Sequence, residues 1–237
     1  MSDPHPGGDP HAMNTADVKA FFDRVASDWD TMRIAYYDER VIDRLGDFAD
    51  LTPDMVVADV GTGTGFVAAG IAPSVARVIG IDISERILDV ARGNLDELGI
   101  DNVDLREGDI TALPLADNSV DAAFANMVLH HAEDPAAMLT EMARVVRPGG
   151  VVAICDEVEH PWEWMREEHA DIWLGFTPEQ VHSFFAAAGL ESPSLEALGA
   201  CSPRLRSKSP RSTCSPPPPA CPRPIGRPMG SAAVCGA

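Results

Sequence analysis

Val56-Val57-Ala58-Asp59-Val60-Gly61-Thr62-Gly63-Thr64-Gly65 is an apolar run that ends in a carboxylate and then opens into three alternating glycines. Such a run is typical of a buried strand, and glycine lets the following turn adopt backbone conformations that other residues avoid. Without a Cβ, the loop also allows a ligand to approach the main chain closely. The stretch therefore predicts a strand that leads into a loop of the size that binds a nucleotide.

Outward from this stretch, short apolar strands alternate with helices of ten to fifteen residues. Strands are predicted at 55–60, 78–81, 103–106, 120–125 and 151–155, with a sixth at 190–197. Helices are predicted at 17–29, 36–48, from Gly65 to Pro73, at 84–98, 134–146 (halted by Pro148-Gly149-Gly150) and 178–188. This alternation is typical of βαβ units, so the fold class is α/β: a doubly wound, mostly parallel sheet with helices on both faces.

Composition divides the 237 residues into three parts. Residues 1–16 are predicted to be a flexible N-terminus, and residues 17–200 one folded domain. Residues 201–237 hold nine of the 20 prolines, four of the five cysteines and six basic residues without an acidic one. This Pro/Ser/Arg/Cys-rich tail has too little apolar surface to offset the entropy of ordering, so it is predicted to be disordered.

The charge of the chain limits its partners. A formal net charge of -19 disfavours general nucleic-acid binding, because phosphate contacts need clustered lysine and arginine. No apolar run has the length of a membrane helix, and the N-terminus does not resemble an export signal, so we expect a cytoplasmic protein without membrane contact that acts on small molecules. The acidity has two open interpretations: adaptation to a salt-rich cytoplasm, or a merely acidic protein.

The glycine loop is compatible with more than one nucleotide. A dinucleotide site places a glycine turn and a helix N-terminus against a pyrophosphate, usually with Gly-x-Gly-x-x-Gly spacing. Here the spacing is Gly-x-Gly-x-Gly, and Phe66 stands in the place of the third glycine. Asp59 would repel a pyrophosphate but would stabilise a cation. S-adenosylmethionine carries an ammonium and a sulfonium and no phosphate, so it suits this loop better, whereas a nucleotide-dependent oxidoreductase is disfavoured.

The residues that follow the other strands extend this pattern. Ligands of open parallel sheets sit at the carboxyl ends of the strands, near the switch in strand order. The residues expected there are Asp82-Ile83, Asp109-Ile110 and Asn126-Met127. Three acids at three consecutive strand ends, counting Asp59, are therefore predicted to line one site.

These motifs and their order resemble the class I S-adenosylmethionine-dependent methyltransferases, in the broad group that includes the ubiquinone/menaquinone methyltransferases. The resemblance covers about residues 17–190. It rests on the glycine loop and on these further motifs: Gly80-Ile81-Asp82-Ile83-Ser84, Gly108-Asp109 with Leu113-Pro114-Leu115, Asn118-Ser119-Val120-Asp121-Ala122, and Arg144-Val145-Val146-Arg147-Pro148-Gly149-Gly150.

The resemblance implies methyl transfer from S-adenosylmethionine to an unidentified small-molecule acceptor, and it implies roles for single residues. Asp59 would hold the cofactor's amino group, and Asp82 the ribose hydroxyls. Asp109 would accept from the adenine amine, flanked by Ile83 and Ile110, and Asn126 would face the cofactor near its methyl group. Backbone contacts to the methionine part would come from Gly61, Thr62, Gly63 and Gly65. For each side chain a structural role stays open: Asp82 as a helix cap, Asp109 and Asn126 without ligand contact.

Catalytic residues are not identified by the sequence. Positioning alone accounts for much of the rate when the acceptor is already nucleophilic, while a hydroxyl or carbon acceptor needs a base. His130 and His131, just beyond the fourth strand, are weak candidates, and packing is the alternative role for both. We also expect aromatic residues outside the sheet to wall an acceptor pocket under the N-terminal helix, with plain packing as the alternative: Trp29, Tyr36, Tyr37, Trp162, Trp164, Trp173 and Phe176.

No metal site is predicted from sequence spacing. Neither His130-His131 nor Glu167-Glu168-His169 has the spacing of a zinc helix, and no two cysteines form a Cys-x-x-Cys pair. An arsenic-type acceptor would call for several cysteines, and only Cys155 belongs to the predicted domain.

The C-terminal end departs from the family pattern. Members of the family complete a seven-stranded sheet with a last, antiparallel strand. In this sequence the proline-rich tail begins near residue 200, where that strand would be expected. We therefore expect this strand to be missing, replaced by a frame-shifted or misjoined end, and the sheet to keep an open edge. The alternative function is then a chain that binds S-adenosylmethionine but is catalytically impaired or regulatory.

Overall fold

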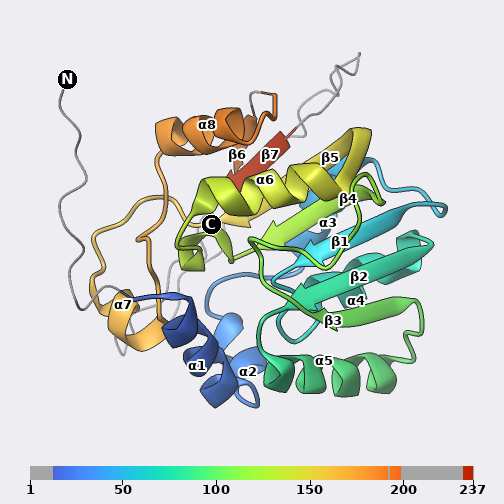
Figure 1. Cartoon of the computed structure of the whole chain (residues 1–237). Helices are drawn as coiled ribbons and strands as arrows, with labels where there is room; N and C mark the ends of the chain where they lie inside the picture. Colours follow the sequence, from blue (N-terminus) through green and yellow to red (C-terminus); the bar gives the residue numbers. More distant parts are fainter. Residues whose placement is uncertain (1–12, 192, 199–231, 237) are drawn as a thin grey trace, which may run out of the picture.

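The computed structural model describes residues 13–191, 193–198 and 232–236. One twisted sheet forms the centre of the fold, with strand order β3-β2-β1-β4-β5-β7-β6 (Figure 1). All pairings between its strands are parallel. The strands are β1 (Val56–Val60), β2 (Arg77–Asp82), β3 (Val103–Glu107), β4 (Val120–Asn126), β5 (Val146–Asp156), β6 (Ser194–Ala197) and β7 (Ala232–Gly236).

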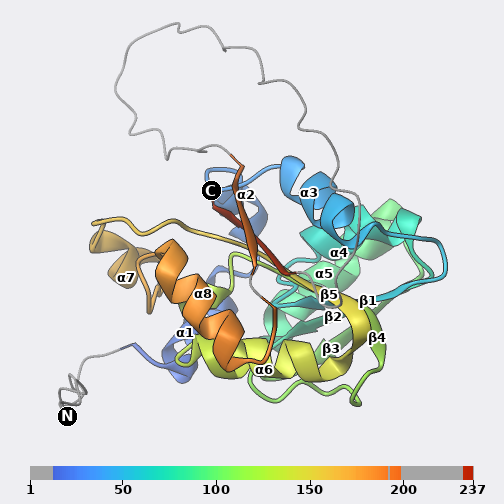
Figure 2. The same cartoon turned by 90° about the horizontal axis from the view of Figure 1, so that it is seen from above.

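Helices cover both faces of the sheet, which confirms the predicted α/β class (Figure 2). On one face, α3 and α4 enclose a core with Val57 and Phe124, and on the other α6 and α8 pack over Ala58 and Ile154. The helices are α1 (Thr15–Val25), α2 (Trp29–Arg33), α3 (Arg40–Ala49), α4 (Phe66–Ile71), α5 (Glu85–Leu98), α6 (Pro135–Val145), α7 (Trp164–His169) and α8 (Pro178–Ala187), with 3-10 turns η1 (Ala72–Ser74) and η2 (Leu129–His131).

Local sequence accounts for several helix ends. The Ser84 side chain caps α5 by accepting from the Ile87 N–H, and Gly99 ends this helix with a positive φ of 68°. Asp134 caps α6 in the same way. At the N-terminus, Asn14 forms a capping box with Asp17, so α1 begins at Thr15. The prediction that residues 1–16 form one flexible segment is therefore wrong for 14–16, while 1–12 lie outside the described residues.

The end of α6 differs from the prediction. The sequence predicts that Pro148-Gly149-Gly150 halts this helix and that a strand begins at 151. Instead, α6 ends at Val145 and β5 starts at once with Val146, which pairs with Val120 of β4. The Pro-Gly-Gly segment lies inside β5, where the register against β4 shifts between Val120 and Ala122.

The edge beyond β5 also differs from the prediction. No strand of the described residues runs antiparallel, as the family's last strand would, yet the edge of β5 is not open. Ala232–Gly236 pairs with β5 on one side and β6 on the other. The expectation of an open edge, and of a tail disordered to its end, is therefore wrong for 232–236; the rest of that expectation falls on 199–231, outside the described residues.

In the described part of the chain, no helix combines the length and apolar character needed to cross a bilayer.

The strand order places a topological switch between β1 and β4. The chain moves outward from β1 through β2 to β3, then returns to pair β4 on the other side of β1. Loops that leave β1 and β4 diverge at such a point and open a crevice at the carboxyl ends of the strands. In Figure 1 the strand arrows point toward α1, α2 and α7, which lie beyond this end of the sheet.

Candidate functional site

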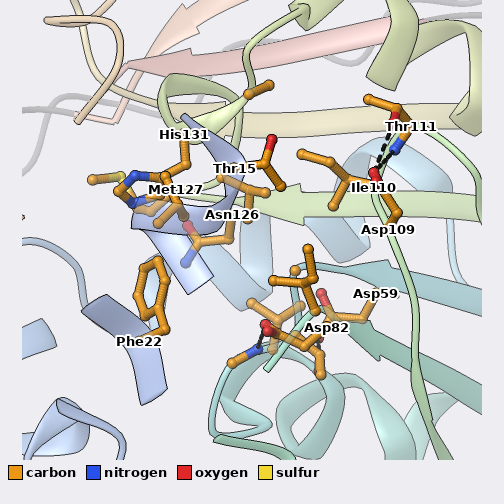
Figure 3. A pocket seen from close by; sticks show the side chains of 18 of the residues that line it. Thr15, Phe22, Asp59, Asp82, Asp109, Ile110, Thr111, Asn126, Met127 and His131 are labelled. Atoms are coloured by element: carbon orange, nitrogen blue, oxygen red, sulfur yellow. Dashed lines mark hydrogen bonds between the residues drawn. The ribbon is translucent and has the colours of Figure 1, made fainter. Parts of the chain in front are cut away.

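A cavity of about 310 Å³ lies at the carboxyl ends of β1, β2 and β4 (Figure 3). Sites for small molecules fall in the range of roughly 300–1,000 Å³, so its size is that of a small-ligand site. Nine of the ten predicted cofactor-binding residues line it: Asp59, Gly61, Thr62, Gly63, Asp82, Ile83, Asp109, Ile110 and Asn126. The structure thus brings these residues together, and their contact with a cofactor stays a prediction.

The glycine loop forms the floor of the cavity, and its shape depends on positive φ angles. Gly61 has φ 69°, and a Cβ there would lie 2.5 Å from Val128 Cγ2 of the loop after β4. Gly63 has φ 55°. Gly65, the tenth predicted residue, does not line the cavity; with φ 84° it starts α4 instead. The loop therefore needs glycine at Gly61 for two reasons, conformation and close packing.

Asp59 is buried at the end of β1 and supports the loop that follows it. Its Oδ2 accepts hydrogen bonds from Thr62 Oγ1 at 2.6 Å and from the Ala68 backbone N–H at 3.1 Å. Burial raises the pKa of Asp59 to about 6, although both hydrogen bonds oppose the shift. A buried carboxyl with a raised pKa favours a cationic partner, which would hold it in the ionised form.

Asp82 connects two loops at the end of β2. Its Oδ2 accepts from the Gly63 backbone N–H and its Oδ1 from that of Ser84, both at 3.0 Å. Burial raises the pKa of this carboxyl, and the backbone donors oppose the shift. Helix capping of α5 falls to Ser84, so the alternative in which Asp82 serves as the cap is wrong. Each carboxylate oxygen can accept a second hydrogen bond, so capacity for a ligand remains.

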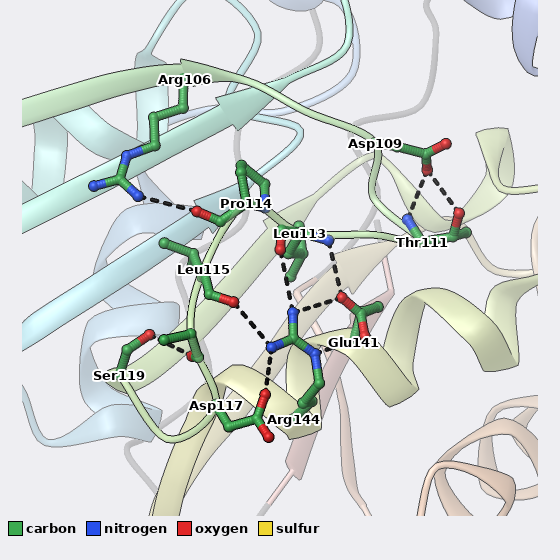
Figure 4. Close-up of polar contacts among 11 residues, drawn as sticks. Arg106, Asp109, Thr111, Leu113, Pro114, Leu115, Asp117, Ser119, Glu141 and Arg144 are labelled. Carbon is green, nitrogen blue, oxygen red and sulfur yellow. Dashed lines mark hydrogen bonds and ion pairs between the residues drawn. The ribbon is translucent and has the colours of Figure 1, made fainter.

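The loops after β1 and β2 form two walls of the cavity, and the loop after β3 forms a third. Arg144 of α6 fixes this third loop in place (Figure 4). Its guanidinium donates to the Leu113 and Leu115 carbonyls at 3.1 and 2.9 Å and forms ion pairs with Asp117 and Glu141, both at 2.7 Å. At the cavity end of the loop, Asp109 Oδ1 accepts from the backbone N–H and the hydroxyl of Thr111, both at 2.7 Å. Arg144 thus holds the segment that presents Asp109 and Ile110.

Asn126 ends β4 inside the cavity and has an unsatisfied acceptor. Its side chain is buried, and no described residue donates to its Oδ1. A buried amide oxygen without a donor costs free energy, so a ligand or water donor is expected at this atom. Next to it, Met127 has φ 56°, an uncommon value for a residue with a side chain, at the point where the chain turns into the cavity wall.

Helix α1 closes the cavity and is docked at both sides. The backbone N–H and hydroxyl of Thr15 donate to Glu133 Oε1 at 2.5 and 2.6 Å. At the opposite side, Lys19 Nζ donates to the Ile83 carbonyl at 3.0 Å. Phe22 of the same helix reaches the cavity (Figure 3). The N-terminal helix therefore bridges the loops after β4 and β2.

Only two of the aromatic residues predicted for an acceptor pocket line this cavity, Trp29 and Tyr37. Trp173 packs with Phe176 and Phe184. The other four do not line the cavity either. Tyr36 Oη lies 2.8 Å from His169 Nε2, and Trp164 lies edge-on to the same ring. Trp162 stacks on His160, and Phe176 packs with Phe184. Plain packing describes Trp173 and Phe176, whereas Trp162 and Trp164 are 41% and 40% exposed.

The two candidate histidines have different positions. His131 lines the cavity, and its Nδ1 donates to the Ala170 carbonyl at 3.1 Å. Burial lowers its pKa well below the usual value, so its ring is neutral at pH 7. His130 lies behind the cavity wall with Nδ1 2.8 Å from Asp156 Oδ1, and the nearby carboxylates raise its pKa to about 9. Of the two, only His131 is placed to contact a ligand in the cavity.

The cavity lining has a one-sided charge. Five carboxylates and no lysine or arginine belong to it among the described residues, and the acids are Asp59, Asp82, Asp109, Glu133 and Asp134. A phosphate-bearing ligand would meet only negative side chains here. A cationic ligand without phosphate fits this lining. The unsatisfied Asn126 Oδ1 also favours such a ligand, because it can accept a hydrogen bond from an ammonium. The residues present thus fit S-adenosylmethionine.

Sequence reasoning missed the residues of α1 that line the cavity, Thr15, Val18 and Phe22. Their spacing places them on one helix face, which was a usable signal. It also missed Val128 and Glu133, which no local pattern marks, because their role depends on the glycine loop and α1 lying opposite them.

Comparisons with known proteins identify a methyltransferase domain in this chain. Residues 58–154 match the methyltransferase domain family. The chain is 37% identical over 116 residues to an arsenite methyltransferase of Halobacterium salinarum, covering 47% of this chain and 29% of that protein. It is 31% identical over 156 residues to a demethylmenaquinone methyltransferase of Lactococcus lactis, covering 63% and 61%.

Among solved structures, an S-adenosylmethionine-dependent methyltransferase from Aquifex aeolicus is similar with a TM-score of 0.56 and 26% identity. The similarity covers 78% of this chain and 90% of that one. The chain spans less than two thirds of the length of the two relatives named above, so it shares a domain with them and not their whole length. By its motifs, its fold and these matches, the domain belongs to the class I S-adenosylmethionine-dependent methyltransferases.

Proposed function

We propose that this protein transfers a methyl group from S-adenosylmethionine to a small-molecule acceptor. The observation that supports this most is the cavity at the β1/β4 switch point, lined by five carboxylates and no basic side chain. It suits a cationic cofactor and disfavours a dinucleotide. When bound, the cofactor supplies an activated methyl group, and the protein has to hold and orient it.

In this proposal each wall of the cavity holds one part of the cofactor. Asp59 and the Asn126 Oδ1 face its ammonium group, and the backbone of Gly61 and Gly63 lies against its methionine part. Asp82 accepts from the ribose hydroxyls while still fixing Gly63. Asp109, already oriented by Thr111, accepts from the adenine amine.

The acceptor would occupy the apolar end of the cavity, under α1. Val18, Phe22, Trp29 and Tyr37 line this part, together with His131. Aromatic walls favour an apolar or aromatic acceptor, and the demethylmenaquinone methyltransferase relative is consistent with that class. The arsenite methyltransferase relative points to another acceptor, but no cysteine lines the cavity in the described part of the chain.

A base is needed only for some acceptors. Where the accepting atom is already nucleophilic, its alignment with the methyl group supplies much of the rate. For a hydroxyl or carbon acceptor, His131 is the residue in contact with the cavity whose neutral ring carries an unprotonated nitrogen, since Nδ1 is the donor to Ala170. His130 is buried behind it and does not reach the cavity.

Calorimetric titration of the full chain with S-adenosylmethionine, S-adenosylhomocysteine and NADH tests the cofactor part of the proposal. We expect binding of the first two and none of NADH; the reverse would overturn it. A screen of aromatic hydroxyl compounds and quinols, read by release of S-adenosylhomocysteine, tests transfer. Tight cofactor binding without turnover on any acceptor would favour a regulatory chain instead. The expected cytoplasmic location stays a prediction.

A further inference from the structure

A second polar cluster lies beside the cavity and shares His131 with its wall. It joins His130 and His131 of η2 to Asp171, which follows α7. One ligand atom from each of the three side chains lies within 4.8 Å of the others. Glu157 and His160, from the segment after β5, form a second group of the same kind with Asp171. Asp171 thus belongs to both groups.

Asp171 is the unusual member of this cluster. Its side chain is 1% exposed, and neither of its oxygens has a hydrogen-bond partner in the described structure. Asp156, equally buried, differs completely: its oxygens accept from the His130 ring and from three backbone N–H groups, those of Val128, Leu129 and Glu157. His130 Nε2 forms an ion pair with Asp171 Oδ1, but at 3.7 Å it does not satisfy that oxygen as a hydrogen-bond donor would. A buried carboxylate without a hydrogen bond is costly, so a closer cationic partner is expected at Asp171.

Both histidines are oriented as metal ligands are. The Nδ1 of His130 is hydrogen-bonded to Asp156, and the Nδ1 of His131 donates to the Ala170 carbonyl. A carboxylate or carbonyl on one ring nitrogen fixes the tautomer and leaves the other nitrogen for the metal. In both residues that nitrogen is Nε2, so an ion bound by His131 would exclude the role of this ring as a base in methyl transfer.

The spacing between ligand atoms agrees with a shared ion. His130 Nε2 lies 3.7 Å from Asp171 Oδ1, too far for a hydrogen bond. Two ligands on one tetrahedral zinc, each bonded at about 2.0 Å, are separated by roughly 3.3 Å, so a small closure of the gap brings both onto one ion.

We propose that His130, His131 and Asp171 bind one divalent transition-metal ion, with zinc as the expected species. Two imidazoles and a carboxylate are ligands that zinc accepts, and nitrogen ligands disfavour magnesium and calcium. Carboxylates at Asp156, Asp171 and Glu157 supply the negative charge that would stabilise the ion. Glu157 belongs to the neighbouring group with His160 and Asp171, and its Oε2 is bonded to His160 Nε2 at 2.7 Å.

This site became recognisable only in three dimensions. The sequence predicts no metal site because the two histidines are adjacent and lack zinc-helix spacing. Asp171, forty residues further along, reaches them because the backbone N–H groups of Ile172 and Trp173 both bond to the His130 carbonyl, at 3.0 and 2.9 Å. The ion would tie the segment after β5 to η2, and since His131 lines the cavity, it would also border the acceptor end.

The test uses the full chain, stripped of metal by chelator and dialysis, and does not depend on methyl transfer. Zinc and cobalt(II) are titrated separately, with magnesium as the unreactive control, and binding is followed by calorimetry and by the visible absorption of cobalt. We expect one equivalent that is lost, or weakened at least tenfold, in Asp171→Asn and in His130→Gln. The matched controls are Glu179→Gln and His182→Gln, exposed positions on α8 that should bind as the unaltered chain does.

Stability measurements separate a lost site from a misfolded variant. In chelator, Asp171→Asn should melt close to the unaltered chain, because the ion pair that it removes, with His130 Nε2, is long at 3.7 Å and the carboxylate makes no hydrogen bond. On addition of zinc, the unaltered chain should gain melting temperature and the variant should not. Equal zinc-induced gains in melting temperature for the unaltered chain and Asp171→Asn, or equal binding stoichiometry, would overturn the proposal. The histidines near the N-terminus and the cysteines of the tail are present in both proteins, so zinc bound there does not contribute to the difference between them.

Discussion

The backbone N–H of Gly63 donates to Asp82 Oδ2 at 3.0 Å, so the carboxylate at the end of β2 shapes the glycine loop after β1. Asp82 therefore has two roles in the proposed site: it can bind the ligand, and it fixes the shape of the glycine loop. The second oxygen holds the Ser84 N–H at the start of α5. Cofactor affinity and local stability are expected to change together at this residue.

Asp82→Asn should accordingly lower both quantities. An amide has one acceptor oxygen where the carboxylate has two, so one of the two backbone donors loses its partner, and hydrogen bonds to charged groups contribute about 1.5–3 kcal/mol. We expect S-adenosylmethionine affinity to fall at least tenfold by calorimetry, with a lower free energy of unfolding in urea. Asp89→Asn, on the exposed face of α5, is the control and should leave affinity unchanged.

Gly61→Ala should destabilise the protein more than Gly99→Ala. The two glycines have nearly equal φ, 69° and 68°, but an added Cβ meets Val128 only at Gly61, while at Gly99 nothing lies within 4 Å. Left-handed backbone alone costs a residue with a Cβ about 1–2 kcal/mol. The difference between the two variants in thermal unfolding isolates the steric part, and Val128→Ala should recover some of it. Equal losses would contradict the packing argument.

The pH dependence of cofactor binding should follow Asp59. With a pKa raised to about 6 by burial, this carboxyl is protonated in the free protein below that pH, and an ammonium binds the ionised form. Affinity should therefore rise as pH increases from about 5 to 7, and binding at the acid end should release a proton. Calorimetry in buffers of different ionisation enthalpy measures that release, and Asp59→Asn should abolish it.

The raised pKa of Asp59 also predicts how the stability of the ligand-free protein depends on pH. Its pKa in the folded state lies above the unfolded value near 3.8, so the native state binds more protons between pH 4 and 6. The contribution of Asp59 to the free energy of unfolding then falls with rising pH over this window, by about 3 kcal/mol, and is constant above it. Urea titrations of the unaltered chain and Asp59→Asn across pH 4–8 should converge at the acid end and diverge in favour of the variant above pH 6.

Arg144→Lys should weaken the third wall of the cavity despite keeping the charge. A lysine ammonium cannot reproduce the planar fork that reaches two carbonyls and two carboxylates. We expect faster hydrogen exchange over residues 109–119 and weaker cofactor binding through Asp109. Arg147→Lys, whose ion pair with Asp121 is more exposed, should change neither.

Removal of the C-terminal strand should expose two edges at once. Deletion of 201–237 takes away β7, which lies between β5 and β6, so both lose their backbone partner. We expect a lower melting temperature and aggregation by light scattering. Deletion of 204–224 instead, which keeps 232–236, is the matched variant and should behave as the full chain; equal losses of stability in the two variants would contradict a contribution of β7 beyond that of residues 204–224.

Much of the fold could be predicted because its signals are local. Strand β1 and the glycine loop follow from one run of apolar and glycine residues, and the ends of α5 follow from Ser84 and Gly99. Two predictions failed where long-range pairing outweighed a local signal. Pro148-Gly149-Gly150 continues a strand because Val146 pairs with Val120, and residues of the atypical tail form a strand because β5 offers an unpaired edge.

The sequence by itself determined that acids and glycines follow the strands β1, β2 and β3, since parallel strands bring their carboxyl ends to one edge regardless of detailed packing. Only the tertiary structure decided how α1 closes the cavity, which histidine faces it, and that Asp171 meets His130. These contacts join residues 39 to 118 positions apart, as in His131 with Ala170 and Thr15 with Glu133. Periodicity and spacing describe neighbours along one element, whereas such contacts depend on how separate elements pack.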